Sequence, residues 1–330
     1  MGAERLTHSF KTALAVLLGF LFTRFIPLPS DQWVIITILV VMCAQVFVGG
    51  VLQKSLLRFL GTVGGCLFGI FFLVTTGTNP IMIGAALMIS AFFFSYLSAS
   101  QENLAYAGTL GAVTVPIILL GQHPSVFLAV SRFLEISLGL LIATLVSQFI
   151  LPINARTHLK RAQVSTLQQL IAYYREAIVI ANDIDREERD ELIAKSLLKQ
   201  RQLAKDSVRE PLGKRFNPER FAEILYSERE ILRAITFMHL ARTHLVNHSA
   251  FQDKTLLAFH ESVIAALTGL ANAIQNKPAP QPFTLPSITT LQQHWQTLAR
   301  TPNDALYLDG YLFNAEILAS NVGKLMELHP

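Results

Sequence analysis

Long apolar stretches separated by short polar breaks fill the first half of the chain. Each stretch has close to the ~20 residues that an α-helix needs to cross ~30 Å of hydrocarbon. The stretches cover residues 10–27, 33–50, 58–76, 80–98, 103–121 and 126–151. This pattern predicts a six-helix transmembrane bundle that forms a transmembrane domain over residues 1–152.

After Pro152 the apolar positions recur three and four residues apart, which is the spacing of helices with one buried face. Three stripes show it: Val164, Leu167, Leu170, Tyr174 and Ile178; Ile224, Ile231, Ile235, Met238 and Leu245; and Leu256, Val263, Leu267, Leu270 and Ile274. The prolines at 278, 280, 282 and 286 predict a non-helical connection, and residues 288–298 and 306–328 predict two closing helices. No strand-like alternation of useful length occurs, so the predicted fold class is all-α, with a helical domain over residues 153–330.

Charged residues are distributed very unevenly between these two halves. Of the 330 residues, 52% are hydrophobic and 15% are charged, which is too apolar for an ordinary soluble protein. Residues 1–152 hold only six of the 27 basic and four of the 23 acidic side chains. The net charge of +4 divides evenly between the halves, and no basic stripe interleaved with aromatic residues indicates nucleic-acid binding.

Basic residues near the ends of the apolar stretches predict the topology. Six spans place both termini on one side of the membrane, and Lys and Arg concentrate on the cytoplasmic side. One side holds Arg5, Lys11, Lys54, Arg58, Arg156, Lys160 and Arg161, and the other only Arg24 and Arg132. We therefore expect both termini and residues 153–330 in the cytoplasm. No small-x-small cleavage pattern follows the first stretch, so we expect it to remain as an uncleaved span.

The motifs of the common enzyme classes are absent from the sequence. It contains no phosphate-binding GxxxxGK[ST] loop, no HExxH, no GxSxG and no dinucleotide fingerprint, so we expect neither an enzyme nor an ATPase. Cys43 and Cys66 lie in apolar stretches and are interpreted as reduced packing residues. His244 and His248 have a metal-binding spacing, but no acid or cysteine nearby completes a site. We expect no metal or other cofactor.

Small residues recur in the third apolar stretch. Gly61, Gly65 and Gly69 repeat every four residues, which is the spacing that lets transmembrane helices approach each other closely. We interpret them as a helix-packing face, and this face is one of two reasons to expect a homodimer. Pro116, inside the fifth stretch, predicts a kink in that helix.

Ionisable residues at the apolar stretches are the sharper functional signal, because they are costly in hydrocarbon. Arg132 and Glu135 are three residues apart and would share one helix face. They are interpreted as a structural ion pair, as part of a solute path, or as charges that reach the outer interface. Lys54 and Arg58, at the cytoplasmic mouth of the third span, either only set the topology or also concentrate anions.

The residues around Lys54 and Arg58 carry a family resemblance. The segment from Val48 to Thr62, VGGVLQKSLLRFLGT, together with Trp33-Val-Ile-Ile-Thr, resembles the fusaric-acid-resistance and aromatic-acid-exporter superfamily, which includes the plant aluminium-activated malate channels. Arg132-x-x-Glu135-x-x-x-Gly139, followed by Pro152, is also similar to this family. The resemblance implies six helices per unit, a cytoplasmic helical domain, a bacterial inner-membrane location and movement of organic acid anions. Many relatives carry two such blocks and this chain carries one, so we expect a homodimer.

Together these features favour a membrane transporter or channel that exports small organic, aromatic carboxylate anions. Lys54, Arg58, Arg132 and Glu135 are the candidate residues of the anion path. An inside-negative potential of ~100 mV favours exit of a monoanion by ~2.3 kcal/mol, so export without an ATPase is energetically reasonable. If transport is coupled to protons, Glu135 and Glu102 are the candidate carriers. The alternative is a non-transporting scaffold that presents a cytoplasmic helical domain to a partner.

Overall fold

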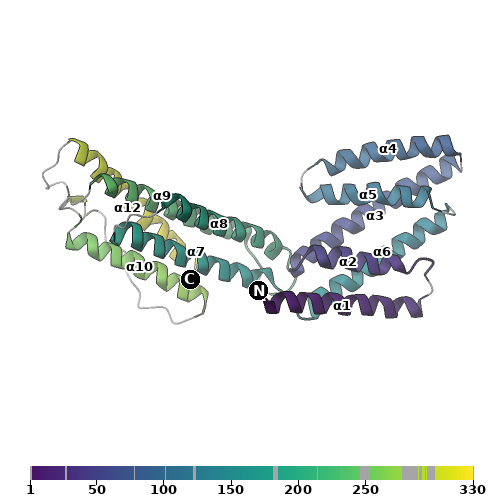
Figure 1. Ribbon diagram of the computed structural model, residues 1–330, viewed down its shortest axis with the longest axis horizontal. Helices are drawn as coiled ribbons and strands as arrows, with labels where there is room; N and C mark the ends of the chain where they lie inside the picture. Colours follow the sequence, from purple (N-terminus) through teal and green to yellow (C-terminus); the bar gives the residue numbers. More distant parts are fainter. Residues whose placement is uncertain are drawn as a thin grey trace. The chain divides into compact units, whose positions relative to one another are not determined.

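The computed structural model is helical, without strands, over the residues that it describes (Figure 1). These are residues 2–26, 28–77, 79–100, 102–121, 124–180, 185–213, 215–245, 251, 253–276, 289, 292–293, 295 and 302–329. The chain divides into two units. The first unit comprises Met1–Ala155 and Arg209–Gly213, and the second unit comprises Arg156–Val208 and Lys214–Pro330.

Antiparallel apolar helices make up the first unit (Figure 1). They are α1 (Gly2–Phe25), α2 (Gln32–Ala44), α3 (Val48–Thr76), α4 (Pro80–Ser98), α5 (Glu102–Leu119) and α6 (Val126–Phe149). Helix α3 packs along α5 and α6, α2 packs against α1 and α6, and α4 packs against α5. The outward side chains of Phe71, Phe92 and Tyr96 are more than half exposed. An apolar exterior of this kind suits contact with lipid chains.

The lengths of these helices differ from those predicted. Helices α1, α3, α4 and α6 are each long and apolar enough to cross a membrane, whereas α2 and the described part of α5 are shorter apolar helices. Helix α2 ends at Ala44, and α3 begins at Val48. Residues 51–57, which lie between the predicted second and third spans, are therefore part of α3. That segment is helical, and the chain breaks earlier, at residues 45–47.

The glycine face of α3 lies against α5 of the same chain. A Cβ atom on Gly65 would come within 2.9 Å of the Gly111 carbonyl oxygen, and one on Gly69 within 2.9 Å of Ile118. Gly61 meets the carbonyl of Ala107 in the same way. Because α5 already fills this face, the glycines do not support the expected homodimer. The state of assembly remains a prediction.

Longer, more polar helices make up the second unit. They are α7 (Ala155–Tyr174), the π-helix η1 (Arg175–Ile180), α8 (Arg186–Val208), α9 (Pro218–His244), α10 (Lys254–Ile274) and α12 (Pro302–Glu327). Helix α9 packs along α12, α8 and η1, and α12 also contacts α10. By length and composition alone α10 could also cross a membrane, so the count of six spans stays a prediction. The predicted proline connection, and most of the helix predicted over residues 288–298, lie outside the described residues.

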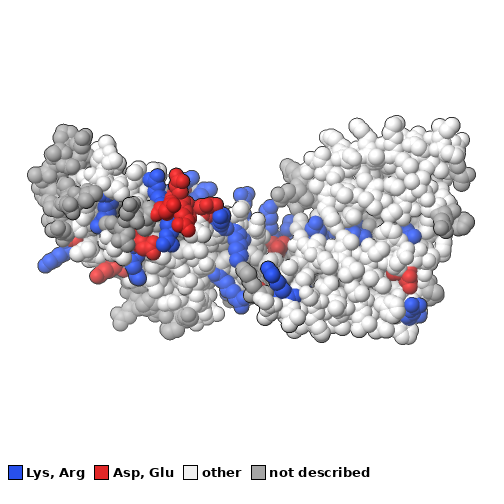
Figure 2. Space-filling model, in the orientation of Figure 1, with Lys and Arg blue, Asp and Glu red and all other residues white. Residues whose placement is uncertain are grey.

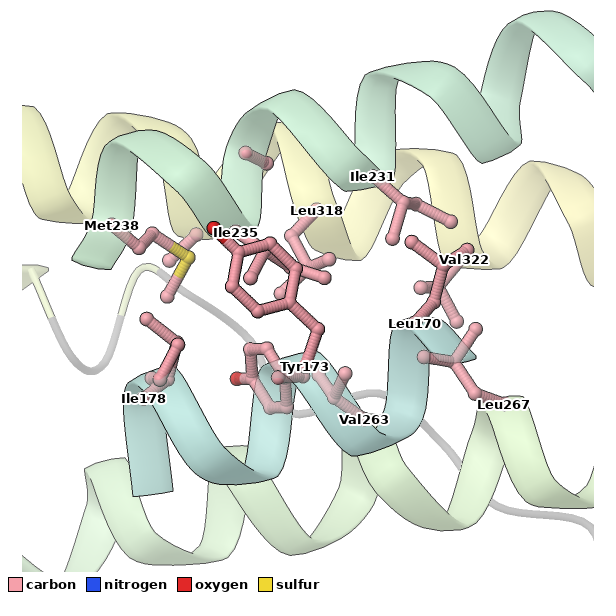
Figure 3. Close-up of a cluster of buried hydrophobic side chains, with 14 of the residues drawn as sticks. Leu170, Tyr173, Ile178, Ile231, Ile235, Met238, Val263, Leu267, Leu318 and Val322 are labelled. Atoms are coloured by element: carbon pink, nitrogen blue, oxygen red, sulfur yellow. The ribbon is translucent and has the colours of Figure 1, made fainter. Parts of the chain in front are cut away.

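The core of the second unit confirms the predicted apolar stripes. Leu170, Ile235 and Leu267, one from each stripe, are fully or almost fully buried in a single cluster. Leu318 and Val322 of α12 complete it. Figure 3 shows how these side chains point toward one another from α7, α9, α10 and α12. One continuous core therefore holds these helices together.

Candidate functional site

Charged side chains are scarce in the first unit. Figure 2 shows an almost uncharged surface over this unit, with a few scattered basic and acidic side chains, whereas charged side chains of both signs are frequent over the second unit. Buried charges in such an apolar environment are costly unless something compensates them. A buried charge whose partners neutralise it serves mainly to stabilise the fold, whereas one without such partners can bind a ligand.

Arg58 is a buried guanidinium without a carboxylate partner among the described residues. It lies on α3 and is only 6% exposed. Its Nη2 donates a hydrogen bond of 3.3 Å to the hydroxyl of Thr37 on α2, while its Nε is buried and has no partner there. Gly139 of α6 lets this helix approach, because a Cβ atom on it would come within 2.8 Å of Thr37. Arg58 thus lies near a close contact of α2 and α6.

Lys54 lies one helical turn before Arg58. Its ammonium nitrogen is 3.9 Å from the centre of the Tyr106 ring on α5, a cation–π contact. The hydroxyl of Tyr106 is buried and has no hydrogen-bond partner within the described part of the chain. Because α3 is helical here, Lys54 is part of the bundle and does not lie in a loop before it.

Hydroxyl groups add polarity to the inner faces of α3 and α6. Thr144 of α6 donates a hydrogen bond of 3.2 Å to Ser55 of α3. Ser147, one turn beyond Thr144, is fully buried, and the described residues supply no partner for its hydroxyl. Polar groups inside a membrane bundle face other helices or water and not lipid.

Arg132 and Glu135 form an ion pair on α6, with Nη1 of Arg132 and Oε2 of Glu135 2.9 Å apart. The other carboxylate oxygen accepts a hydrogen bond of 2.8 Å from the backbone N–H of Ser30. The Arg132 guanidinium also stacks 4.9 Å from the Trp33 ring centre. Glu135 is fully buried against the connection between α1 and α2, and the position of the pair relative to the outer interface stays a prediction. A role of the pair in the anion path remains a prediction.

Lys11 is a buried cation, although the sequence pattern indicates it only as one of the topology-setting charges. It lies on α1 and is 0% exposed. The sequence does carry a signal of this burial. Lys11 shares one helix face with Ala15 and Gly19, since the three recur every four residues, and all three are buried. The side chain of Glu102, the second acid considered for proton transfer, lies outside the described side chains.

The residues considered for metal binding or disulfides have other surroundings. The His244 ring stacks on Tyr307, with ring centres 4.4 Å apart, and His248 lies outside the described residues. Within the described chain, no group of three or more His, Cys, Asp or Glu side chains could hold a metal ion. Cys43 and Cys66 are both free thiols.

The second unit buries two polar networks. Glu228 of α9 accepts a hydrogen bond of 2.7 Å from Gln200 of α8, which also donates to Thr166 of α7 at 2.8 Å. Burial raises the pKa of Glu228 to about 8, and the Gln200 hydrogen bond only partly opposes this shift. In the second network, Tyr174 lies 2.7 Å from Nδ1 of His260. Burial, reinforced by the charge of Arg242, lowers the pKa of His260 to about 3.

An apolar helical bundle with a few buried basic residues defines the chain as an integral membrane protein. The chain belongs to the fusaric acid resistance protein family, whose model matches residues 5–320. This match covers both units, so the second unit is part of the family pattern and not an unrelated addition.

Two kinds of curated relatives are similar to parts of the chain. Inner membrane protein YeeA of Escherichia coli (strain K12) is 31% identical over 144 residues, which are 43% of this chain and 40% of YeeA. The p-hydroxybenzoic acid efflux pump subunit AaeB of Pectobacterium carotovorum subsp. carotovorum (strain PC1) is 25% identical over 170 residues, which are 48% of this chain and 26% of AaeB. The similarity thus spans less than half the length of either relative.

Proposed function

We propose that the chain forms a membrane efflux transporter or channel for small organic carboxylate anions, including aromatic ones. The observation that carries the proposal is Arg58, a guanidinium buried among apolar helices. Within the described residues it has one hydroxyl partner, and its Nε has none. Family membership supports an efflux role, and the printed name of the AaeB relatives supports an aromatic acid substrate.

The chemistry of Arg58 favours a carboxylate ligand. A guanidinium binds carboxylates through charge-assisted hydrogen bonds, and its planar fork can match both carboxylate oxygens. Low dielectric and weak screening in the bundle strengthen this attraction relative to water. Thr37 occupies only one of the five donors of Arg58. The remaining donors can hold an anion, while the apolar bundle around them suits an aromatic ring.

The same proposal includes the predicted topology and assembly. We place both termini and the second unit in the cytoplasm, in a bacterial inner membrane, because basic residues cluster at that side of the spans. The membrane potential then drives anions outward. We retain the homodimer as the expected assembly, although the glycine face of α3 no longer argues for it.

Flux of benzoate into or out of proteoliposomes tests the proposal, with Arg58→Gln as the test variant. Loss of a charge-assisted hydrogen bond costs about 1.5–3 kcal/mol, so flux at low benzoate concentration should fall about tenfold or more. Arg24→Gln is the matched control, since Arg24 is exposed at the end of α1 and only stacks on Phe20. The control should transport like the wild type.

The result for the wild type separates transport from the scaffold alternative. Folded wild-type protein that moves no benzoate above the rate of empty liposomes would favour a scaffold that only anchors the second unit. If Arg58→Gln transports benzoate as fast as the wild type, efflux is still supported, but Arg58 does not contribute to the anion path.

A further inference from the structure

Lys11 lies inside the first unit with very little to compensate its charge. The ammonium nitrogen donates one hydrogen bond, of 3.5 Å, to the carbonyl of Val46. No carboxylate in the described part of the chain lies within ion-pair distance of it. His8 lies three residues earlier on α1, and its buried Nδ1 also lacks a partner among the described residues. An ammonium has three donors, so two of them remain for another group.

The surroundings of Lys11 are the break between α2 and α3. Helix α2 ends at Ala44, and α3 starts at Val48 with no side chain capping it. The N–H of Val48 binds the carbonyl of Ile153. The next two residues, Gly49 and Gly50, are buried in the first turn, where N–H groups have no acceptor within the helix. The start of a helix carries positive partial charge, so Lys11 and α3 both favour an anion at this break.

We propose that Lys11 is a second anion-binding residue, which takes the carboxylate of the exported anion at the α2–α3 break. This inference rests on the proposed function and extends it to a residue on α1. Lys54 and Arg58 follow on α3 six and ten residues after Val48, about 9 and 15 Å farther along the helix axis. A carboxylate can then pass between fixed cations at successive levels. Several weak sites suit conduction better than one strong site.

A purely structural role for Lys11 makes a different prediction. The last carbonyls of α2 carry partial negative charge, and Lys11 could simply stabilise this helix end through Val46. Replacing Lys11 would then destabilise the protein without affecting anion binding. If instead Lys11 is held in place for a ligand, its removal relieves a poorly compensated buried charge.

Benzoate binding to the purified full chain, measured by titration calorimetry together with thermal unfolding, tests these alternatives. Lys11→Met keeps the side-chain volume and removes the charge. It should unfold at the wild-type temperature or higher without benzoate, and bind benzoate at least tenfold more weakly. Lys11→Arg keeps the charge and should retain most of the affinity. Arg5→Met is the matched control, because Arg5 is exposed on the same helix and should bind like the wild type.

The inference is overturned if Lys11→Met unfolds at a lower temperature but binds benzoate with wild-type affinity, or if the wild type binds no benzoate. Benzoate flux through the wild type in proteoliposomes shows whether the proposed transport function holds independently of the Lys11 site. If the wild type transports benzoate and Lys11→Met binds it with unchanged affinity, only the Lys11 site is contradicted. If benzoate binding depends on Lys11 but the wild type shows no flux, the Lys11 site is supported and the proposed transport function is contradicted.

Discussion

At the scale of single residues, Arg58 and Arg132 show two ways of holding a guanidinium inside an apolar bundle. Arg132 pairs with Glu135, which the Ser30 N–H also satisfies, so this part of α6 is tied to the connection between α1 and α2. Arg58 has a neutral hydroxyl as its partner. A paired charge is largely neutralised, whereas a charge without a counter-ion still attracts an anion. The two residues therefore suit different tasks.

Glu228 allows a prediction about pH and stability. Its pKa rises from 4.5 to about 8 in the folded second unit because the carboxyl is buried. Between these values the folded state holds a proton that the unfolded chain has lost, so stability should fall as pH rises through this window. Glu228→Gln keeps a neutral, isosteric group. Its unfolding temperature should depend less on pH between about 5 and 8 than that of the wild type.

Glu223→Gln provides the control for this measurement. Glu223 is exposed on the same helix, so its replacement should leave the wild-type pH dependence of the unfolding temperature intact. An equal pH dependence in Glu228→Gln and the wild type would mean that Glu228 is ionised in the folded protein throughout this range.

At the scale of helices, α3 organises the first unit. Its 29 residues span about 43 Å, more than the hydrocarbon layer, while the 13 residues of α2 span about 20 Å. In the proposed spanning arrangement, a helix as short as α2 leaves its ends and the following break inside or close to the apolar layer. Non-helical backbone is tolerated there only when protein or a cavity surrounds it. This explains why the α2–α3 break is a good place for a polar site.

The contact between α3 and α5 predicts a difference between two neighbouring glycines. A Cβ atom on Gly65 would lie 2.5 Å from Cβ of Thr114 and 2.9 Å from a backbone oxygen, neither of which can move easily. A Cβ atom on Gly64 would have as its nearest neighbour the Phe94 ring at 3.6 Å, an ordinary contact. Gly65→Ala should destabilise the protein by about 1–3 kcal/mol through overpacking. Thermal unfolding in detergent measures the effect.

Gly64→Ala is the matched control, and its unfolding temperature should stay near that of the wild type. Alanine also has a higher helix propensity than glycine, so a small stabilisation of this variant is expected. Equal unfolding temperatures for the two variants would contradict the close approach of α3 and α5.

At the scale of the whole molecule, the predicted topology is testable by cysteine labelling in cells. After replacement of Cys43 and Cys66, a cysteine at Arg201, which is exposed on α8, should react with a membrane-impermeant maleimide only after permeabilisation. A cysteine at Phe25, which is 85% exposed at the end of α1, should react in intact cells. Labelling of position 201 in intact cells would contradict a cytoplasmic second unit.

The sequence by itself determined the helical character of the chain, the family, and which residues face the second core. Apolar periodicity specifies these features because burial of an apolar face depends mainly on local spacing. Leu170, Ile235 and Leu267 were found in this way. The resemblance around Val48–Thr62 also pointed to Lys54 and Arg58 before any contact was known.

Only the tertiary structure decided the partners of the charged and small residues. The sequence could not tell that α5 covers Gly65, that Glu135 binds Ser30 across 105 positions, or that Lys11 is buried beside Val46. Local patterns state that a residue is basic and near an apolar stretch, but not which distant segment lies opposite. The environment of a buried charge depends on those distant segments. For that reason a difference emerges only once the helices are packed: Arg132 pairs with Glu135, whereas Arg58 and Lys11 have no carboxylate partner among the described residues.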